Sequence, residues 1–209
     1  MNSIRHCIGV ACVAVLSACT TVMSHSQSGF LSSYAGLTHS IDGSSASIRF
    51  ATVIDPARVT IGDIEWHVAA DAGLGDEERR APLNQLSDEL VARVRELPAA
   101  PEGRPVVLRE AITRVETVSP ALNAVSALLF VVPLDRGGAS VDVEAFDPGT
   151  GEQLAALTIG YFAPLSELKS HFNRLAPARL ALRKAASDFG ALLRPAAGSV
   201  NAANRLSTT

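Results

Sequence analysis

The 209-residue sequence has neither a block of basic residues nor a long apolar run. Its 18 lysines and arginines are outnumbered by 21 aspartates and glutamates, so the formal net charge is −3. Proteins that hold nucleic acid gather positive charge on one surface, and this balance therefore argues against a nucleic-acid partner. No stretch approaches the ~20 consecutive apolar residues of a membrane-spanning helix.

Motifs of the common enzyme and cofactor classes are also missing. The sequence contains no G-x-S-x-G nucleophile elbow. Its glycine clusters at Gly137-Gly138 and Gly149–Gly151 follow turn residues and do not open a helix, as a phosphate-binding loop would. We therefore expect no nucleotide or other cofactor. A hydrophobic content of 47% nevertheless excludes a chain that is disordered throughout.

Cysteine is confined to the first 19 residues. Arg5 and the apolar stretch Cys7–Leu16 are typical of a signal peptide, which we predict over residues 1–18. The segment Leu16–Cys19 (LSAC) resembles the lipobox of bacterial lipoproteins, in which the cysteine is lipidated after the preceding bond is cleaved. A following residue other than aspartate, here Thr20, implies transfer to the outer membrane in Gram-negative lipoproteins. The alternative is an ordinary signal peptide followed by a chance cysteine.

Lipidation of Cys19 would leave the mature chain without a free thiol. Cys7 and Cys12 would be removed with the signal peptide, and Cys19 would carry palmitate or a related acyl chain. Disulfides, thiolate catalysis and cysteine-bound metal are then all excluded. Several acyl chains would make the membrane anchor effectively permanent.

The mature chain divides into three predicted parts. Residues 19–28 are polar and aperiodic, and we expect a lipidated flexible tether. Residues 29–193 carry the hydrophobic periodicity of a single α/β domain, which would lie in the periplasm. Residues 194–209 are small and polar, and we expect a disordered tail.

Hydrophobic spacing predicts the elements of the domain. Phe30–Leu37 is expected to form a short helical turn docked on the domain. A longer helix is predicted over Leu83–Leu97, with Pro82 in its first turn. Beyond Pro164 the spacing predicts two helices, or one helix kinked at Pro177. The predicted strands are Ala57–Val68 with a β-bulge at Gly62, Arg104–Glu116, Ala139–Phe146 and Gln153–Phe162.

The order of these elements favours an α/β fold of the α+β type. Apolar and polar residues alternate in Val141–Ala145, as they do in an antiparallel sheet with one covered face. We therefore expect a two-layer sandwich, in which helices pack on one face of a mainly antiparallel sheet.

Polar residues alternate along one predicted strand. Asp63, Glu65 and His67 would share a face, and Asp142 and Glu144 could join them from another strand. Two carboxylates and an imidazole can ligate a divalent metal or act as general acid and base, which would suit a metal-assisted hydrolase. A solvated sheet face gives the same pattern, and it is the interpretation that we prefer. We therefore predict no metal and no catalytic residue.

The segment Val118–Pro133 is more apolar than an ordinary loop. It is expected to be a buried strand or helix, or else a hydrophobic surface that meets a partner or the lipid interface through Leu128, Leu129 and Phe130. His171 falls off the apolar stripe of its predicted helix, and we expect it to be exposed.

Four segments share the motifs of one protein family: Ser28–Leu37, Arg109–Glu116, Gly138–Glu144 and Asp147–Ala155. Together they extend over roughly Ser28–Leu193. They resemble domain of unknown function 3313, an uncharacterised family of bacterial lipoproteins. The resemblance implies a role associated with the cell envelope, and no catalytic residues come with it.

The function expected from the sequence is that of a non-enzymatic outer-membrane lipoprotein. Its periplasmic domain would act as an accessory or binding module in envelope assembly, transport or maintenance, with an envelope protein as partner. The alternatives are a metal-assisted hydrolase at Asp63, Glu65 and His67, and a binder of small ligands in a pocket between sheet and helices.

Lipidation is directly testable. We expect labelled palmitate to enter the wild-type chain in cells and to be absent from the Cys19→Ala variant, because the acylated thiol is then missing. The measurement is autoradiography of the immunoprecipitated protein, together with the mass of its mature N-terminus. Equal labelling of both chains would contradict the lipobox assignment.

Overall fold

The computed structural model describes residues 22–23, 27–50, 52–68, 73–130 and 135–195. The predicted signal peptide, Cys19 and nearly all of the predicted tail lie outside the described residues. Within them, no helix is long and apolar enough to cross a membrane.

One sheet of seven strands runs through the domain in the order β1-β2-β7-β6-β5-β3, and β4 also pairs with β5. Its centre is antiparallel, while β3 and β4 run parallel to β5. The strands are β1 (Thr38–His39), β2 (Ser45–Arg49), β3 (Ile54–Ile61), β4 (Glu65–Trp66), β5 (Arg104–Glu116), β6 (Gly138–Phe146) and β7 (Gln153–Phe162).

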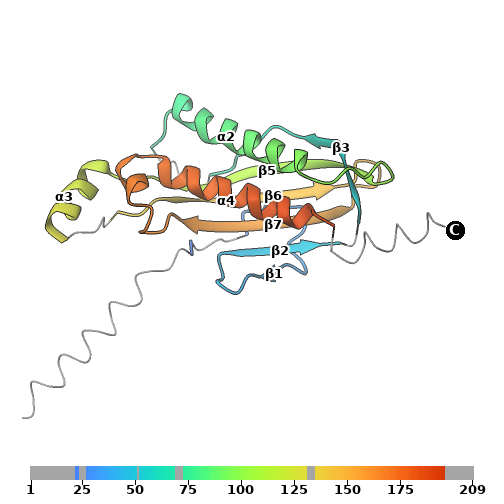
Figure 1. Ribbon diagram of the computed structural model, residues 1–209, viewed down its shortest axis with the longest axis horizontal. Coiled ribbons are helices and arrows are strands. Elements are labelled where there is room, and N and C mark those ends of the chain that lie inside the picture. Colours follow the sequence, from blue (N-terminus) through green and yellow to red (C-terminus); the bar gives the residue numbers. More distant parts are fainter. Residues whose placement is uncertain (1–21, 24–26, 51, 69–72, 131–134, 196–209) are drawn as a thin grey trace, which may run out of the picture.

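Two long helices cover one face of this sheet. Figure 1 shows α2 (Asp76–Arg95) and α4 (Ala176–Leu193) side by side across the central strands. Leu86 and Leu90 of α2 and Phe189 of α4 are fully buried in the core between helices and sheet. The predicted α+β fold, a mainly antiparallel sheet with helices on one face, is thus confirmed.

The two ends of the sheet carry different elements. At one end β5 finishes at Glu116 and β7 at Phe162, and both are in register with the start of β6 at Gly138. We call this the α3 end, because α3 (Pro120–Phe130) projects from it in Figure 1. The opposite end carries the turn between β6 and β7, and we call it the hairpin end.

Helix α2 begins earlier than its apolar pattern predicts. It starts at Asp76, so Pro82 lies inside the helix and the prediction of Pro82 in the first turn is wrong. The first turn contains Asp76, Glu77 and Glu78, whose negative charges favour a helix N-terminus. No apolar residue marks that turn, which is why hydrophobic spacing missed it.

The predicted strand Ala57–Val68 is interrupted rather than continuous. Ile61 pairs with Leu108 and Glu65 with Ala111, so four residues on this side span three on β5. This side therefore contains one residue more than β5 does, and the extra residue lies within Gly62–Ile64. The predicted change of phase is confirmed, since Val59, Ile61, Ile64, Trp66 and Val68 all pack against the core.

Other helical predictions fail in detail. Phe30–Leu37 forms bends and turns rather than a helical turn, although it does dock, with Phe30 and Leu31 buried. Beyond Pro164 the structure has a short 3-10 helix, η2 (Leu168–Phe172), and α4 begins with Pro177 in its first turn. His171 is fully buried rather than exposed.

Two residues of the predicted tether belong to the domain. Val22 forms a bridge with Tyr161, and the Met23 side chain is completely buried. The glycines Gly138 and Gly160 leave room for this strand-like segment, since a Cβ at Gly160 would collide with the Met23 carbonyl oxygen. An isolated Val-Met pair among polar residues gives no period, so the sequence did not reveal this contact.

An unpaired acid lies in the core. Glu110 projects from β5 toward the helices between Leu108 and Ile112, and it is completely buried. Neither of its carboxylate oxygens has a hydrogen-bond partner in the part of the chain that the structure describes. Burial raises the pKa of Glu110 from 4.5 to about 8. The side chain is therefore neutral at pH 7 in the folded protein.

This acid makes stability depend on pH. Between the unfolded pKa of 4.5 and the folded pKa of about 8, the folded chain retains a proton that the unfolded chain has released. Stability should therefore fall as pH rises through that interval, by up to about 1.4 kcal/mol per pH unit. Glu110→Gln cannot ionise and should flatten the dependence. Urea unfolding of the chain from Thr20 onward, repeated across this pH range, measures the effect, and identical slopes for both chains would contradict it.

Candidate functional site

The face of the sheet opposite the long helices is covered by residues 27–37. Asp142 and Glu144 project from β6 into this interface and are buried there. The Ser28 hydroxyl and the Tyr34 hydroxyl both donate to Asp142 Oδ2, at 2.6 and 2.8 Å. A buried carboxylate is tolerated only when such donors replace its lost hydration.

Glu144 has even more donors. It accepts hydrogen bonds from the Ser32 backbone N–H and hydroxyl, each at 2.8 Å, from the Gln153 amide at 2.8 Å and from the Arg109 guanidinium at 2.9 Å. The same guanidinium lies 5.0 Å from the centre of the Phe30 ring. These contacts occupy the carboxylate and leave it no free position for a metal or substrate, so Glu144 holds the covering segment in place.

This network, the β6 clamp, unites residues from separate parts of the sequence. It joins the motif segments 28–37, 109–116 and 138–144 with Gln153 of β7. The sequence indicated only that Asp142 and Glu144 could join Asp63, Glu65 and His67 on one polar face. Alternation along β6 identified their common face, but it could not show that a distant segment covers it.

Asp63, Glu65 and His67 are all exposed, which is the arrangement of a solvated polar face. His67 also contacts the covering segment, because its Nε2 lies 3.2 Å from the Ser28 carbonyl oxygen. Among the described residues, no group of three His, Cys, Asp or Glu side chains could hold a metal ion. The structure thus does not bring the two sets of carboxylates together.

Helix α3 turns polar side chains toward the protein. Asn123 is fully buried, and its amide nitrogen donates to the carbonyl oxygens of His171 and Asp135, at 2.7 and 2.9 Å. Its amide oxygen accepts from the Asp135 N–H at 2.8 Å. Ser126 is also buried, and its hydroxyl donates to the Asn123 carbonyl at 3.2 Å. Hydrogen bonds rather than apolar packing therefore attach α3 to the domain.

The outer side of α3 is apolar. Leu122 and Val125 are 51% and 55% exposed, and Leu128 and Leu129 are 84% and 66% exposed. The side chain of Phe130, the third residue of the predicted surface, lies outside what the structure describes. No charged residue occurs in the helix. The buried-segment alternative predicted for Val118–Pro133 is therefore wrong for these four side chains. Leu128 and Leu129 are exposed, and their contact with a partner or with lipid stays a prediction.

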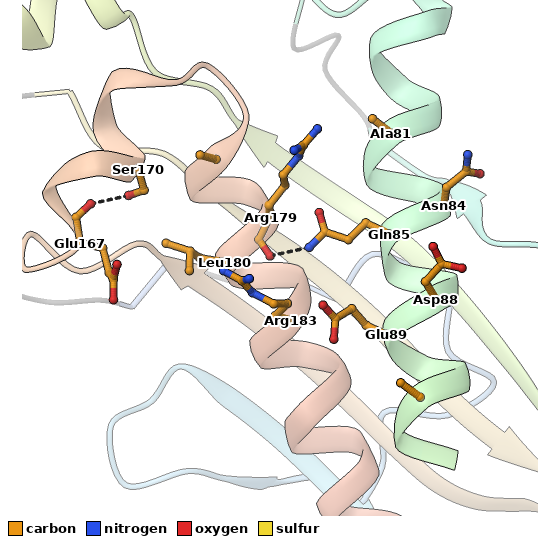
Figure 2. Close-up of a pocket in the computed structure, with 12 residues that line it drawn as sticks. Ala81, Asn84, Gln85, Asp88, Glu89, Glu167, Ser170, Arg179, Leu180 and Arg183 are labelled. Atoms are coloured by element: carbon orange, nitrogen blue, oxygen red, sulfur yellow. Dashed lines mark hydrogen bonds between the residues drawn. The ribbon is translucent and has the colours of Figure 1, made fainter. Parts of the chain in front are cut away.

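An open groove separates the outer faces of α2 and α4. It has a volume of about 790 Å³ and is lined by both helices, by Ser170 of η2 and by Glu167 just before η2. Figure 2 shows Gln85 bridging its floor, where the Gln85 amide donates to the Arg179 carbonyl at 3.0 Å. Asp88 and Glu89 of α2 and Arg183 of α4 also line the groove, and Figure 2 shows the Glu89 carboxylate directed toward α4.

The charges of this groove are available to a partner. Asp88, Arg179 and Arg183 are exposed, and no ion pair forms on these side chains within the described ranges. Acidic and basic groups along one opening suit a polar partner that carries charges of both signs. Sequence reasoning missed the groove, because it depends on how the exposed sides of two distant helices meet.

Comparison with known proteins gives one family and several distant structural likenesses. A family model described as "Protein of unknown function (DUF3313)" matches residues 26–189. No curated protein matches the chain significantly. A variant PelC dodecamer from Paraburkholderia phytofirmans superposes with a TM-score of 0.43 and 13% identity, covering 73% of this chain and 98% of that one. A second PelC dodecamer structure from that organism gives 0.43 and 13%, covering 68% and 95%. Likenesses at this level indicate nothing about function.

The β6 clamp should be essential to stability. Glu144→Ala leaves the Ser32 N–H, the Gln153 amide and the Arg109 guanidinium without their shared acceptor, so we expect a loss of about 2–4 kcal/mol. The measurement is urea unfolding of the chain from Thr20 onward.

The matched control is the exposed set on the same side of the sheet. Substituting Asp63, Glu65 and His67 together by alanine should change the unfolding free energy by less than about 1 kcal/mol, because exposed charges contribute little. A triple variant as unstable as Glu144→Ala would show that the exposed set also holds structure.

Proposed function

The chain belongs to the DUF3313 family. From this premise we propose that it is an outer-membrane lipoprotein anchored through Cys19. We further propose that its periplasmic domain is a non-enzymatic binding module in envelope assembly, transport or maintenance. The observation that carries the binding role is the charged groove between α2 and α4. It is open to solvent, and eight of the twelve residues that line it are polar or charged.

The groove suits an extended segment of another protein. Asp88 and Glu89 on one wall and Arg179 and Arg183 on the other would pair with opposite charges of such a segment. The Gln85 bridge to α4 fixes the distance between the walls, so the site is formed before a partner arrives. We therefore propose an envelope protein with both acidic and basic residues as the partner.

The lipid anchor is supported by the sequence and by the way the N-terminal segment is held. The β6 clamp fixes residues 28–34, and Val22 and Met23 pair with β7. A chain fixed this close to Cys19 would keep the domain next to the bilayer rather than on a long tether. That arrangement suits a module that acts at the membrane surface.

The binding role is tested by photocrosslinking in living cells. We would place p-benzoylphenylalanine at Asn84 in the groove of the full-length lipoprotein, and at Thr150 on the hairpin end as the control. We expect adducts of defined mass, identified by mass spectrometry as an envelope protein, from Asn84 alone. Adding Arg183→Ala should reduce their yield about tenfold, which corresponds to ~1.4 kcal/mol of binding free energy.

Two outcomes would contradict the binding role. Identical adducts from both positions would show that contacts are random, and absence of adducts from Asn84 would show that the groove is empty in the cell. Adducts that persist undiminished with Arg183→Ala would place the partner elsewhere than on the charged wall.

A further inference from the structure

The chain enters the domain at the α3 end of the sheet. Val22 pairs with Tyr161, one residue before the end of β7, and the Met23 N–H donates to the Gly160 carbonyl at 3.1 Å. Phe162 shares a register row with Gly138, which pairs with the last residue of β5, Glu116. Helix α3 begins four residues beyond Glu116.

Covalent geometry limits how far the anchor can be from this point. Val22 is three residue steps from Cys19. A fully extended chain advances at most about 3.6 Å per step, so the lipidated cysteine lies within about 11 Å of Val22. The bilayer that receives the acyl chains must therefore approach the domain from the α3 end.

The exposed apolar side chains gather at the same end. Leu122, Val125, Leu128 and Leu129 line α3, and the half-exposed Phe172 ends η2, which packs against α3. Of the other large apolar residues that are exposed within the described ranges, only Phe50 and Val53 lie toward the hairpin end.

A second apolar tip stands on the other side of the chain entry. Ile41 is fully exposed at the turn between β1 and β2. The Ser44 carbonyl in this turn accepts from the Gly160 N–H, which places the turn next to the entering chain. Asp42 Oδ1 accepts hydrogen bonds from the Ser40 hydroxyl at 2.7 Å and from the Ser44 hydroxyl at 2.8 Å, so a built turn displays Ile41.

We propose that the α3 end of the domain lies in the interfacial region of the lipid bilayer, with the apolar side of α3 inserted among the acyl chains. The proposal rests on the proposed lipidation of Cys19. Leu122, Val125, Leu128 and Leu129 span an arc of about 120° on the helix, the width of an ordinary apolar face. The helix is about 16 Å long and uncharged, so no charged group has to be desolvated when this face is buried.

The lipid surface is favoured over a protein partner by proximity. The covalent anchor holds the bilayer within about 11 Å of the domain at all times, whereas a second protein would have to find the same face by diffusion. The polar side of α3 is already satisfied by Asn123, Ser126 and their partners. Insertion therefore fixes how the domain stands on the membrane.

The test measures the surroundings of single side chains in the lipidated full-length protein. Because the mature chain has no free thiol, Leu128→Cys introduces a single site for an environment-sensitive fluorophore, and Thr150→Cys on the hairpin end is the matched control. Both proteins are reconstituted into vesicles of phosphatidylethanolamine and phosphatidylglycerol, with and without brominated acyl chains. We expect a blue-shifted emission at position 128 that brominated lipid quenches several-fold, and a water-like, unquenched emission at position 150.

Each other outcome has a defined meaning. Equal, water-like emission at both positions would overturn the insertion of α3. A blue shift at position 128 without quenching would also overturn it, and would show that a second copy of the chain covers the face. The mass of the mature N-terminus is measured on the same samples. A missing lipid would refute the lipoprotein proposal itself, whereas a lipidated protein with a solvated position 128 would refute only the insertion.

Discussion

The buried carboxylates of β6 are the constraint on which the rest of the architecture depends. The helical face of the sheet is covered by two long helices, whereas the opposite face carries no helix of the described residues and is closed by residues 27–37. Phe30 and Leu31 supply only a small apolar cluster there. The covering segment is therefore held by charge-assisted hydrogen bonds to Asp142 and Glu144, which are stronger than neutral ones and demand a defined geometry. Through this clamp, the chain that follows Cys19 becomes part of the folded domain.

The clamp also explains which parts of the structure hydrophobic patterning can predict. Strands β5 and β7 begin and end where the sequence placed them, because both alternate or run apolar between clear turn residues. The segment around Phe30 has apolar residues at helical spacing, yet it forms bends and turns. Its conformation is decided by side-chain donors that must reach two carboxylates more than a hundred residues away. Local periodicity contains no information about such partners.

The candidate surfaces also show that local patterning predicts the character of a residue but not its long-range partners. The apolar character of Leu128 and Leu129 was evident from the sequence, but whether they were buried depended on Asn123. Its side chain bonds the backbone at His171 and Asp135, and so turns the polar side of α3 inward and the leucines outward. Hydrophobic residues usually face the core, and this helix reverses the rule because its attachment is polar. Predicting the groove between α2 and α4 would also require the relative placement of two helices that are far apart in the sequence.

Buried acids lie on both faces of the sheet, Glu110 on one and the acids of the β6 clamp on the other, and the protein accommodates them in different ways. On the clamp face, Glu144 forms an ion pair with Arg109 and is surrounded by donors, so its burial stabilises a defined contact. On the helical face, Glu110 has no donor in the described part of the structure, and burial keeps it protonated. The neighbouring residues Arg109 and Glu110 point to opposite faces of β5, so a single dipeptide supplies a cation to one layer and an acid to the other. An apolar residue in place of Glu110 would pack with Leu108 and Ile112 without the free-energy cost of burying an acid. The core therefore retains an acid that its packing does not require.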